Sequence, residues 1–432
     1  MTNRRGSLIR HRDFNLLWAG QTVSKVGTEV SVLAIPLIAI QLLDATTLEV
    51  GGLTAVEFLP FLLVGLPAGA WVDRMRRRRV LIVADIGRLV ALASIPVVHS
   101  VATLTIAQLY VVAFVTGVLT VFFDVAYQSY LPELVERAQL VEGNAKLAAT
   151  ESGAHIVGPG LGGALIGWLG AAAAVAADAA SYAVSLVSLL SIHAPGEEPD
   201  VPYGGRPSLV SDIREGLRFV WHEHRIRAVA FCTSMSNLFS AVQGAVILLL
   251  MTRMLGFSGT KIGVVFAFAG VGAVIGAVSA PWLARRLGVG KAILVGIIVA
   301  GVGPLLIAAA TGASAAVLIA VGIGLQGGGG VAYNINQVSV RQALCPRRLL
   351  GRMNASVRFM VWGTLPVGGF LGGVLGTAIG IRSTLWVAAT GQALAFVWLL
   401  PSPIPSMVDM PEPGDDTDVE LVLGSAIEAP PS

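Results

Sequence analysis

Charged side chains are scarce in this sequence. Asp, Glu, Lys and Arg make up 13% of its 432 residues, whereas roughly 25% is usual for soluble domains. The mean hydropathy is +0.76. A soluble protein needs polar side chains to cover its surface, so this composition excludes an ordinary soluble chain. A lipid environment removes that need, and the 51 glycines are typical of closely packed membrane helices.

Cysteine is also scarce, and no ATP-binding motif is present. Cys232 falls in an apolar run and Cys345 in a basic loop, which argues against a structural disulfide, and neither has the spacing of metal ligands. The sequence contains no G-x-x-x-x-G-K-[ST] motif, so we expect no ATP hydrolysis by a P-loop. We therefore expect neither a bound metal nor another cofactor.

The apolar residues form twelve runs that are long enough to cross a bilayer, which takes about 20 helical residues. The runs are 14–43, 48–72, 79–99, 104–130, 142–168 and 171–193, followed by 226–252, 259–285, 290–311, 313–341, 350–379 and 382–401. The sequence therefore predicts an all-α membrane protein with 12 transmembrane helices in two six-helix bundles, residues 1–193 and 226–401.

Two polar segments lie outside these bundles. Residues 194–225 begin with a turn-rich stretch and continue, from Pro207, with apolar and charged residues on opposite helical faces. This pattern predicts a cytoplasmic linker with an amphipathic helix on the membrane surface. Residues 402–432 combine many acidic residues with prolines, which predicts a disordered acidic cytoplasmic tail.

Basic residues are concentrated in alternate loops. The loops after the even-numbered helices hold Arg74, Arg76 to Arg79, Arg137, Lys146, Arg206 to Arg227, Arg285, Arg286, Lys291, Arg341, Arg347, Arg348 and Arg352, and the opposite loops hold Arg253, Lys261 and Arg382. Because short cytoplasmic loops carry the excess of Lys and Arg, we expect both termini in the cytoplasm. The expected location is the inner (plasma) membrane, crossed many times.

The loop between the second and third predicted helices carries a specific motif. Its Gly69, Asp73, Arg74, Arg77 and Arg78 resemble the major facilitator signature G-x-x-x-D-R-x-x-R-R. The resemblance implies a major facilitator fold. It also implies that this loop is a conformational latch, which holds the two bundles together on the cytoplasmic side.

A second motif lies in the fifth predicted helix. Gly158, Pro159, Gly162 and Gly163 resemble the G-P-x-x-G-G antiporter motif, which occurs mainly in exporters of the same superfamily. A proline removes one backbone hydrogen bond and bends a helix, and glycines open a groove for a neighbouring helix. Ordinary packing of small residues is the alternative interpretation.

The resemblance extends over residues 8–401 and is to the bacterial exporter branch that includes enterobactin and macrolide efflux proteins. It rests also on Phe123 to Gln128, Leu131 to Val135 and Leu350 to Met353. One departure is Tyr127, where members of this branch usually have Arg, so a proton-coupling role of that Arg cannot be transferred.

The resemblance implies a secondary transporter that works by alternating access. We expect proton-coupled efflux of a small amphipathic organic compound, such as a drug, natural product or siderophore, from a monomer that contacts its substrate and the lipid bilayer. The expected energy source is the proton gradient, and neither an ATPase partner nor nucleic acid is expected. A proton-coupled importer, a membrane receptor and a scaffold of the same fold remain alternatives. A channel would need a pore-lining ring, and the sequence indicates none.

Ionisable residues inside the predicted helices are the candidates for proton coupling, because each costs roughly 2.5–3.5 kcal/mol at mid-depth on insertion scales and so needs a reason. Glu29 is the first candidate proton carrier, and Glu57 and Glu151 follow; Lys25, one turn from Glu29, is an alternative ion-pair partner for it. Asp85, Arg88, Asp124, Asp178 and Arg358 are interpreted as structural charges. Asp85 and Arg88 are interpreted as an ion pair, with a proton relay as the alternative for these two residues.

The predicted topology can be tested with single cysteines at Thr47 and Ser208, in a background that lacks Cys232 and Cys345. An impermeant thiol reagent applied to intact cells should label Thr47→Cys and leave Ser208→Cys unlabelled, because positively charged loops stay in the cytoplasm. The reverse labelling pattern would overturn the orientation.

Overall fold

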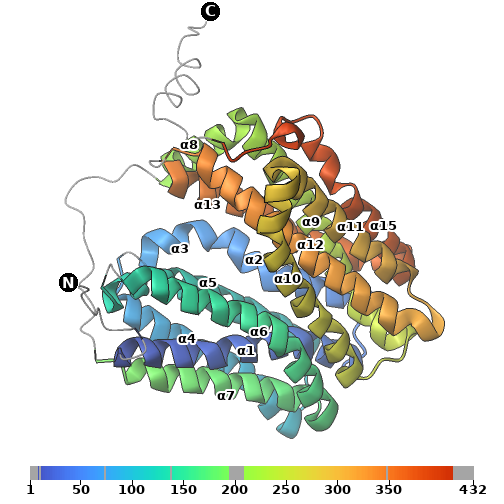
Figure 1. Cartoon of the computed structure of the whole chain (residues 1–432). Helices are drawn as coiled ribbons and strands as arrows, with labels where there is room; N and C mark the ends of the chain where they lie inside the picture. Colours follow the sequence, from blue (N-terminus) through green and yellow to red (C-terminus); the bar gives the residue numbers. More distant parts are fainter. Residues whose placement is uncertain are drawn as a thin grey trace, which may run out of the picture. The chain divides into compact units, whose positions relative to one another are not determined.

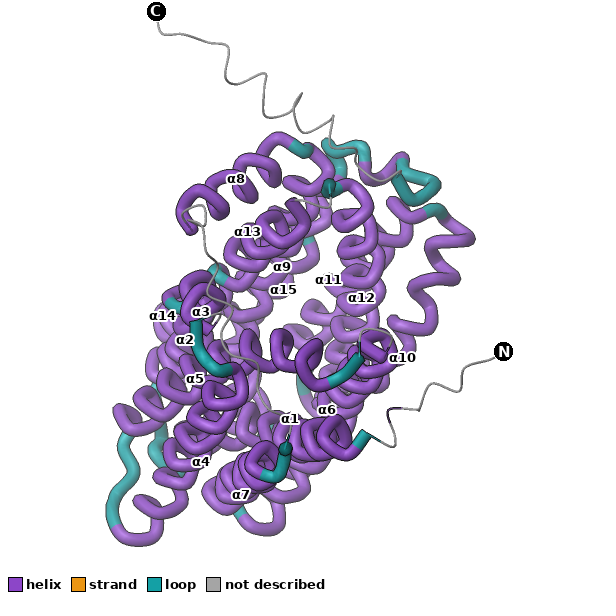
Figure 2. Tube along the Cα trace, turned by 90° about the vertical axis from the view of Figure 1, so that its left-hand side faces the viewer, coloured by secondary structure: helices purple, strands orange, loops and turns teal. Residues whose placement is uncertain are grey.

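The computed structural model describes Leu8 and residues 11–72, 74–136, 139–193, 209–346 and 349–411. All regular structure in these residues is helical (Figures 1 and 2). The first helices are α1 (Arg12–Gln41), α2 (Thr47–Leu63), α3 (Gly65–Val72), α4 (Arg77–Val101), α5 (Ile106–Leu134), α6 (Leu140–Leu169) and α7 (Ala171–Leu190). They are followed by α8 (Leu209–His222), α9 (His224–Leu249), α10 (Gly259–Leu287), α11 (Val289–Ala309), α12 (Ala315–Leu344), α13 (Leu350–Trp362), α14 (Thr364–Ala378) and α15 (Ile381–Ala393).

The chain groups into two compact units. Unit 1 comprises Met1–Tyr203 and Ile247–Gly270, and unit 2 comprises Gly204–Val246 and Val271–Ser432. The first half of α10 therefore belongs with α1 to α7. The predicted bundle boundaries at residues 193 and 226 follow chain order alone, and they stay a prediction.

Each predicted membrane helix coincides with one helix or one consecutive pair of helices. Nine helical segments of the described residues are long and apolar enough to cross a membrane, and three predicted spans are not among them. Residues 48–72 divide into α2 and α3 at Val64, and α15 ends at Ala393, after which the chain continues as a 3-10 turn. The third, α6, is long enough, but glycines and polar side chains lower its hydropathy. The all-α membrane fold is confirmed, and the count of twelve stays a prediction.

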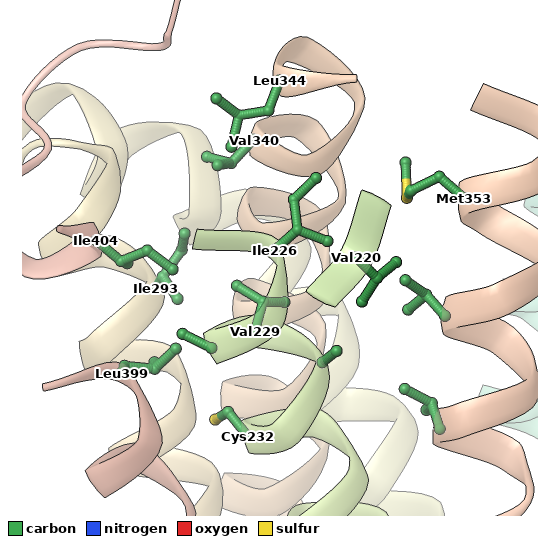
Figure 3. Packing of buried hydrophobic residues seen from close by; sticks show 14 of the residues in the cluster. Val220, Ile226, Val229, Cys232, Ile293, Val340, Leu344, Met353, Leu399 and Ile404 are labelled. Atoms are coloured by element: carbon green, nitrogen blue, oxygen red, sulfur yellow. The ribbon is translucent and has the colours of Figure 1, made fainter. Parts of the chain in front are cut away.

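The predicted amphipathic helix is present as α8. Its Phe219 and Val220 are buried in an apolar cluster of unit 2, together with Ile226, Val229 and Met353 (Figure 3). This burial fixes α8 against the membrane helices of its own unit, as the amphipathic pattern requires. Residues 194–208, the first part of the predicted linker, lie outside the described residues.

The contact between α8 and α13 is close. A Cβ atom on Gly216 would lie 2.4 Å from the carbonyl oxygen of Arg352, so only glycine allows this approach. The Arg352 guanidinium also donates to the Glu215 carboxylate. The linker helix is therefore part of the folded unit 2.

The prediction of a disordered tail from residue 402 is wrong for residues 402–411. Ile404 is fully buried, and the carbonyl groups of Met407 and Val408 accept hydrogen bonds from the N–H groups of Gly290 and Val289, at 2.9 and 3.0 Å. The first N–H groups of a helix lack partners within that helix, so the start of α11 supplies donors that order this segment. Residues 412–432 lie outside the described residues.

Both cysteines are free and buried, so the native protein should resist thiol reagents. Burial raises the pKa of the Cys345 thiol to about 11, and the thiolate is the reactive form. We expect a maleimide to label neither Cys232 nor Cys345 at neutral pH in the purified native protein, and to label both after denaturation in detergent. Labelling at equal rates in the two states would contradict the burial.

Candidate functional site

Helix α1 presents polar side chains to two neighbouring helices. Trp18, Thr22 and Glu29 contact α6, whereas Gln21, Thr28 and Ser31 contact α7. Spacings of three, four or seven residues place each set on one helical face. Figure 1 shows α6 and α7 with α1 within unit 1, and both helices pack extensively on α1. These polar side-chain contacts of unit 1 are therefore centred on α1.

On the α6 side, Glu29 is held by a histidine. The Nδ1 atom of His155 lies 2.8 Å from Oε1 of Glu29, and the Glu29 side chain is only 17% exposed. His155 is not among the residues that the sequence predicted for this site. The available signal was an ionisable side chain within the predicted helix 142–168, three residues before Gly158. A carboxyl group beside an imidazole supplies the two kinds of side chain that general acid–base chemistry uses most often.

The other charges near this pair differ in their partners. Lys25 pairs with Asp124, with 3.7 Å between Nζ and Oδ1, so the alternative pairing of Lys25 with Glu29 is wrong. Glu57 on α2 is half-buried and Glu151 on α6 is exposed. Glu57 lies within electrostatic range of Glu29, and Glu151 within range of His155. The structure thus brings the three candidate carriers into one electrostatic neighbourhood, with Glu29 as the one in direct contact with a titratable partner.

The glycine motif of α6 explains how α1 comes so close. A Cβ atom on Gly158 would lie 2.3 Å from Cβ of Glu29, and one on Gly162 would lie 3.1 Å from Cα of Val30. Gly158 follows His155 by one helical turn, so it clears the space in which the Glu29 side chain reaches His155. The first part of the motif therefore shapes the Glu29–His155 pair.

The opposite face of the same motif contacts α10. A Cβ atom on Gly163 would lie 2.4 Å from Cα of Gly263, and one on Gly167 would lie 1.9 Å from the hydroxyl of Thr260. These α10 residues belong to unit 1. The backbones of α6 and α10 are thus in direct contact, as glycine-lined helix pairs in membranes allow. The glycine motif therefore allows close packing of α6 against both α1 and α10. Because the motif lies beside Glu29, the α1–α6 packing and the charge of Glu29 affect each other.

On the α7 side, α1 covers a buried charged network. Asp178 accepts hydrogen bonds from Ser31 of α1 and from Ser181, the latter at 3.0 Å. Asp85 on α4 forms the predicted ion pair with Arg88 and accepts a hydrogen bond from Ser185 at 2.7 Å. This confirms that Asp85 and Arg88 are in contact, and it adds Asp178 to the same buried region.

The motif loop between α3 and α4 is only partly described, because Asp73 lies outside the described residues. Arg77 donates to the Glu133 carboxylate at the end of α5. Arg78 donates to the carbonyl oxygens of Leu189 and Leu190 at the end of α7, at 3.0–3.2 Å. Two arginines of the motif thus fasten the start of α4 to its neighbours within unit 1.

The two remaining motif residues, Gly69 and Arg74, make no comparable contact with the part of the chain that the structure describes. Arg74 is exposed, and a Cβ atom on Gly69 would meet no heavy atom within 4 Å. The role of these residues as a conformational latch stays a prediction.

Unit 2 has a different polar character. The sequence contains no Asp or Glu between Glu223 and Asp409. Instead, Gln243 donates to Gln326, Gln326 to Gln392, and Gln392 back to Gln243, at 3.3, 2.8 and 2.8 Å. Arg358 lies 4.4 Å from the centre of the Trp362 ring, which stabilises a cation without a carboxylate. The described membrane helices of unit 2 therefore have no carboxyl group that could carry a proton.

The family comparison covers nearly the whole chain. The family described as transmembrane secretion effector, a group of major facilitator transporters, matches residues 7–421. The multidrug efflux pump Tap of Mycolicibacterium fortuitum is 27% identical over 397 residues, which cover 89% of this chain and 93% of that protein. The protein of the same name from Mycobacterium tuberculosis (strain ATCC 25618 / H37Rv) is 29% identical over 215 residues, or 48% of this chain and 50% of that protein.

Solved structures agree on the fold. A bacterial homologue of the iron transporter ferroportin, in an inward-facing state, has a TM-score of 0.72 and 17% identity over 92% of this chain and 99% of that chain. The nucleoside transporter NupG has a TM-score of 0.70 and 12% identity over 90% of this chain and 98% of that chain. At these identities, the likeness concerns the fold alone.

The α6–α10 contact predicts a contrast between two glycines of one helix. Gly163→Ala should lower the thermal stability of the purified protein, because backbone atoms of Gly263 must move and overpacking costs about 1–3 kcal/mol. Gly153→Ala should leave it equal or higher, because its Cβ meets no atom within 4 Å and Ala favours helix by about 1 kcal/mol. Thermal unfolding followed by tryptophan fluorescence measures both. Equal stability of the two variants would show that the helices do not touch there.

Proposed function

The chain belongs to the transmembrane secretion effector family of major facilitator transporters, and on that premise we propose that it exports a small amphipathic organic compound in exchange for protons. The observation that carries this proposal is the Glu29–His155 pair, 2.8 Å apart, beside the glycine motif that resembles the exporters' antiporter motif. Members of this family are transporters rather than enzymes, so the site is interpreted as a binding and proton-exchange site.

Export is supported by two independent features. The relative from Mycolicibacterium fortuitum, 93% of which aligns with this chain, is called a multidrug efflux pump. The glycine motif of α6 resembles a motif that is typical of exporters. The composition of the site fits an amphipathic compound, because unit 1 places Glu29, Glu57, Asp124 and Glu151 on helices whose other residues are largely apolar. An importer would have the same fold as an exporter, so the direction of transport in vesicles is what distinguishes export from import.

Protons are the proposed energy source, and unit 1 is where they would bind. The sequence has no P-loop motif, and the acidic residues of the membrane helices all lie before Glu223. Glu29 has a titratable partner and a low exposure of 17%, which suits a group that must hold a proton away from bulk water.

The proposed cycle follows from the chemistry of the pair. With Glu29 ionised and His155 protonated, the pair holds α1 against α6. Protonation of Glu29 removes the attraction between the two side chains, and the α1–α6 contact is then held by the glycine packing, the Thr150 hydrogen bonds and the Lys146 ammonium near the rings of Phe14 and Trp18. Alternating access requires the two halves to rearrange around the substrate, and this change at α1 would bias that rearrangement.

The proposal also covers the oligomeric state, the membrane location and the latch of the protein. The protein would act as a monomer in the inner membrane with both termini in the cytoplasm, and it would need neither a bound cofactor nor an ATPase partner. Gly69, Asp73, Arg74, Arg77 and Arg78 would form the cytoplasmic latch. The contacts of Arg77 and Arg78 with α5 and α7 support a stiff base for that loop.

The Glu29–His155 pair gives the central prediction. Glu29→Gln should lower the initial rate of pH-driven uphill efflux at least about tenfold, equivalent to about 1.4 kcal/mol, because the amide cannot carry a proton. Substrate counterflow, which needs no net proton movement, should persist. His155→Gln should shift the pH at which efflux is half-maximal, because Glu29 loses its titratable partner. Transport into inverted membrane vesicles measures all three quantities.

Glu57→Gln is the matched control, because Glu57 lies near Glu29 without the histidine contact, and its effect should be smaller. If Glu29→Gln vesicles still concentrate substrate, the proton carrier is another residue. If collapse of the pH gradient leaves wild-type export unchanged, proton antiport is the wrong mechanism. Accumulation in right-side-out vesicles would indicate import.

A further inference from the structure

The most deeply buried charges of unit 1 lie away from the Glu29–His155 pair. Asp85, Asp178 and Arg88 are 0%, 1% and 4% exposed, and they lie where α1, α4, α5 and α7 meet. The Arg88 guanidinium is held between two aromatic rings, 4.1 Å from the centre of Phe123 and 4.4 Å from that of Tyr182. This arrangement excludes water from the cation and from both carboxyl groups.

The charges of this cluster do not balance. Two carboxylates and one guanidinium leave one negative charge if all three groups are ionised. Among the residues that the structure describes, the neighbouring helices supply no second cation. The groups that face the cluster are Thr28, Ser31 and Gln21 from α1, Phe123 from α5, and Ser181, Tyr182 and Ser185 from α7. Lys25 is paired with Asp124, and His155 with Glu29.

An unpaired buried charge is too costly to persist. Even after relaxation, removing one ion from water costs several kcal/mol, and ionisable groups in this situation take up a proton and become neutral. Serine hydroxyls donate hydrogen bonds to Asp178, but they bring no net positive charge. Two carboxyl groups that share one cation therefore need one further positive charge.

We propose that Asp85, Arg88 and Asp178 form a second proton-binding site, which holds one proton at neutral pH and is separate from the Glu29–His155 pair. The proton resides on Asp178, because Arg88 is paired with Asp85. The Ser31 hydroxyl accepts the hydrogen bond from the protonated carboxyl group, since a hydroxyl can act as donor or acceptor. The use of this proton in transport rests on the proposed function, whereas its presence does not.

The geometry also gives the proton a second position. Asp85 is hydrogen-bonded to Ser185, which follows Asp178 by seven residues on α7, or about 10 Å along the helix. Arg88 interacts electrostatically with Asp178 as well as with Asp85, and its Nε atom has no hydrogen-bond partner among the described residues. If the guanidinium turns from Asp85 to Asp178, the proton must move to Asp85. The site can therefore shift one proton from one carboxyl group to the other without a change of net charge.

Infrared spectroscopy of the purified protein tests the site directly, because a protonated carboxyl group absorbs apart from a carboxylate. Wild type at neutral pH should show a carboxylic acid band that persists in Glu29→Gln. Asp178→Asn and Asp85→Asn should each lose this band, because the remaining carboxylate then pairs with Arg88 and needs no proton. Arg88→Gln should double it, because both carboxyl groups lose their cation.

The two Asn variants keep the shape and neutrality of the cluster, so they should fold even if Arg88→Gln does not. A band that survives in Asp178→Asn, or one that is absent from wild type, would overturn the proposal. The exchange between the two carboxyl groups is tested by the number of protons moved per substrate, which should fall by one in either Asn variant; an unchanged number would overturn the exchange. A wild type that shows the band but no proton-driven efflux would refute the proposed function and leave the site standing.

Discussion

A charge or polar group that is buried in a membrane protein must find a partner, because lipid supplies none and an unsatisfied group costs several kcal/mol. This constraint accounts for the interior of both units. In unit 1 it sets the buried pair Asp85–Arg88, the serine contacts of Asp178 and the partly exposed pair Lys25–Asp124. In unit 2 it closes three glutamine side chains into a ring. The same requirement makes an unbalanced cluster of charges a place where a proton can bind.

Close packing is the second constraint, and it depends on glycine at particular positions. Gly158 and Gly162 let α1 approach α6, and Gly163 lets α10 approach the opposite face. Gly153 in the same helix faces open space, so glycine content alone does not reveal which residues form the contacts. The motif therefore places the Glu29–His155 pair and two helix contacts within a few turns of α6, where a change in charge would act directly on packing.

The sequence predicts the fold well and the partners poorly, for a physical reason. Apolar length decides where helices lie, so the twelve predicted spans coincide with helices, although the break at Val64 depends on local geometry. The partner of each charged side chain depends on which helical faces pack against each other in the folded unit. Lys25 and Glu29 are one turn apart, a spacing that favours an ion pair in an isolated helix, yet Asp124 and His155 from other helices replace that pair. The ordered structure of residues 402–411 could likewise not be predicted from the sequence, because it depends on hydrogen bonds from the N–H groups at the start of α11.

The two units differ in the titratable side chains of their membrane helices. This difference limits the places at which the proposed proton gradient would act. The glutamine ring of unit 2 is neutral at every physiological pH, since amide side chains do not titrate, so that part of the unit is insensitive to protons. Unit 1 holds titratable groups on both sides of α1, with Glu29 facing α6 and Ser31 facing Asp178. A proton bound on either side changes a contact of the same helix. Because α1 is shared, the two sites need no direct contact to influence each other, and α1 is the element through which proton binding would reach the substrate.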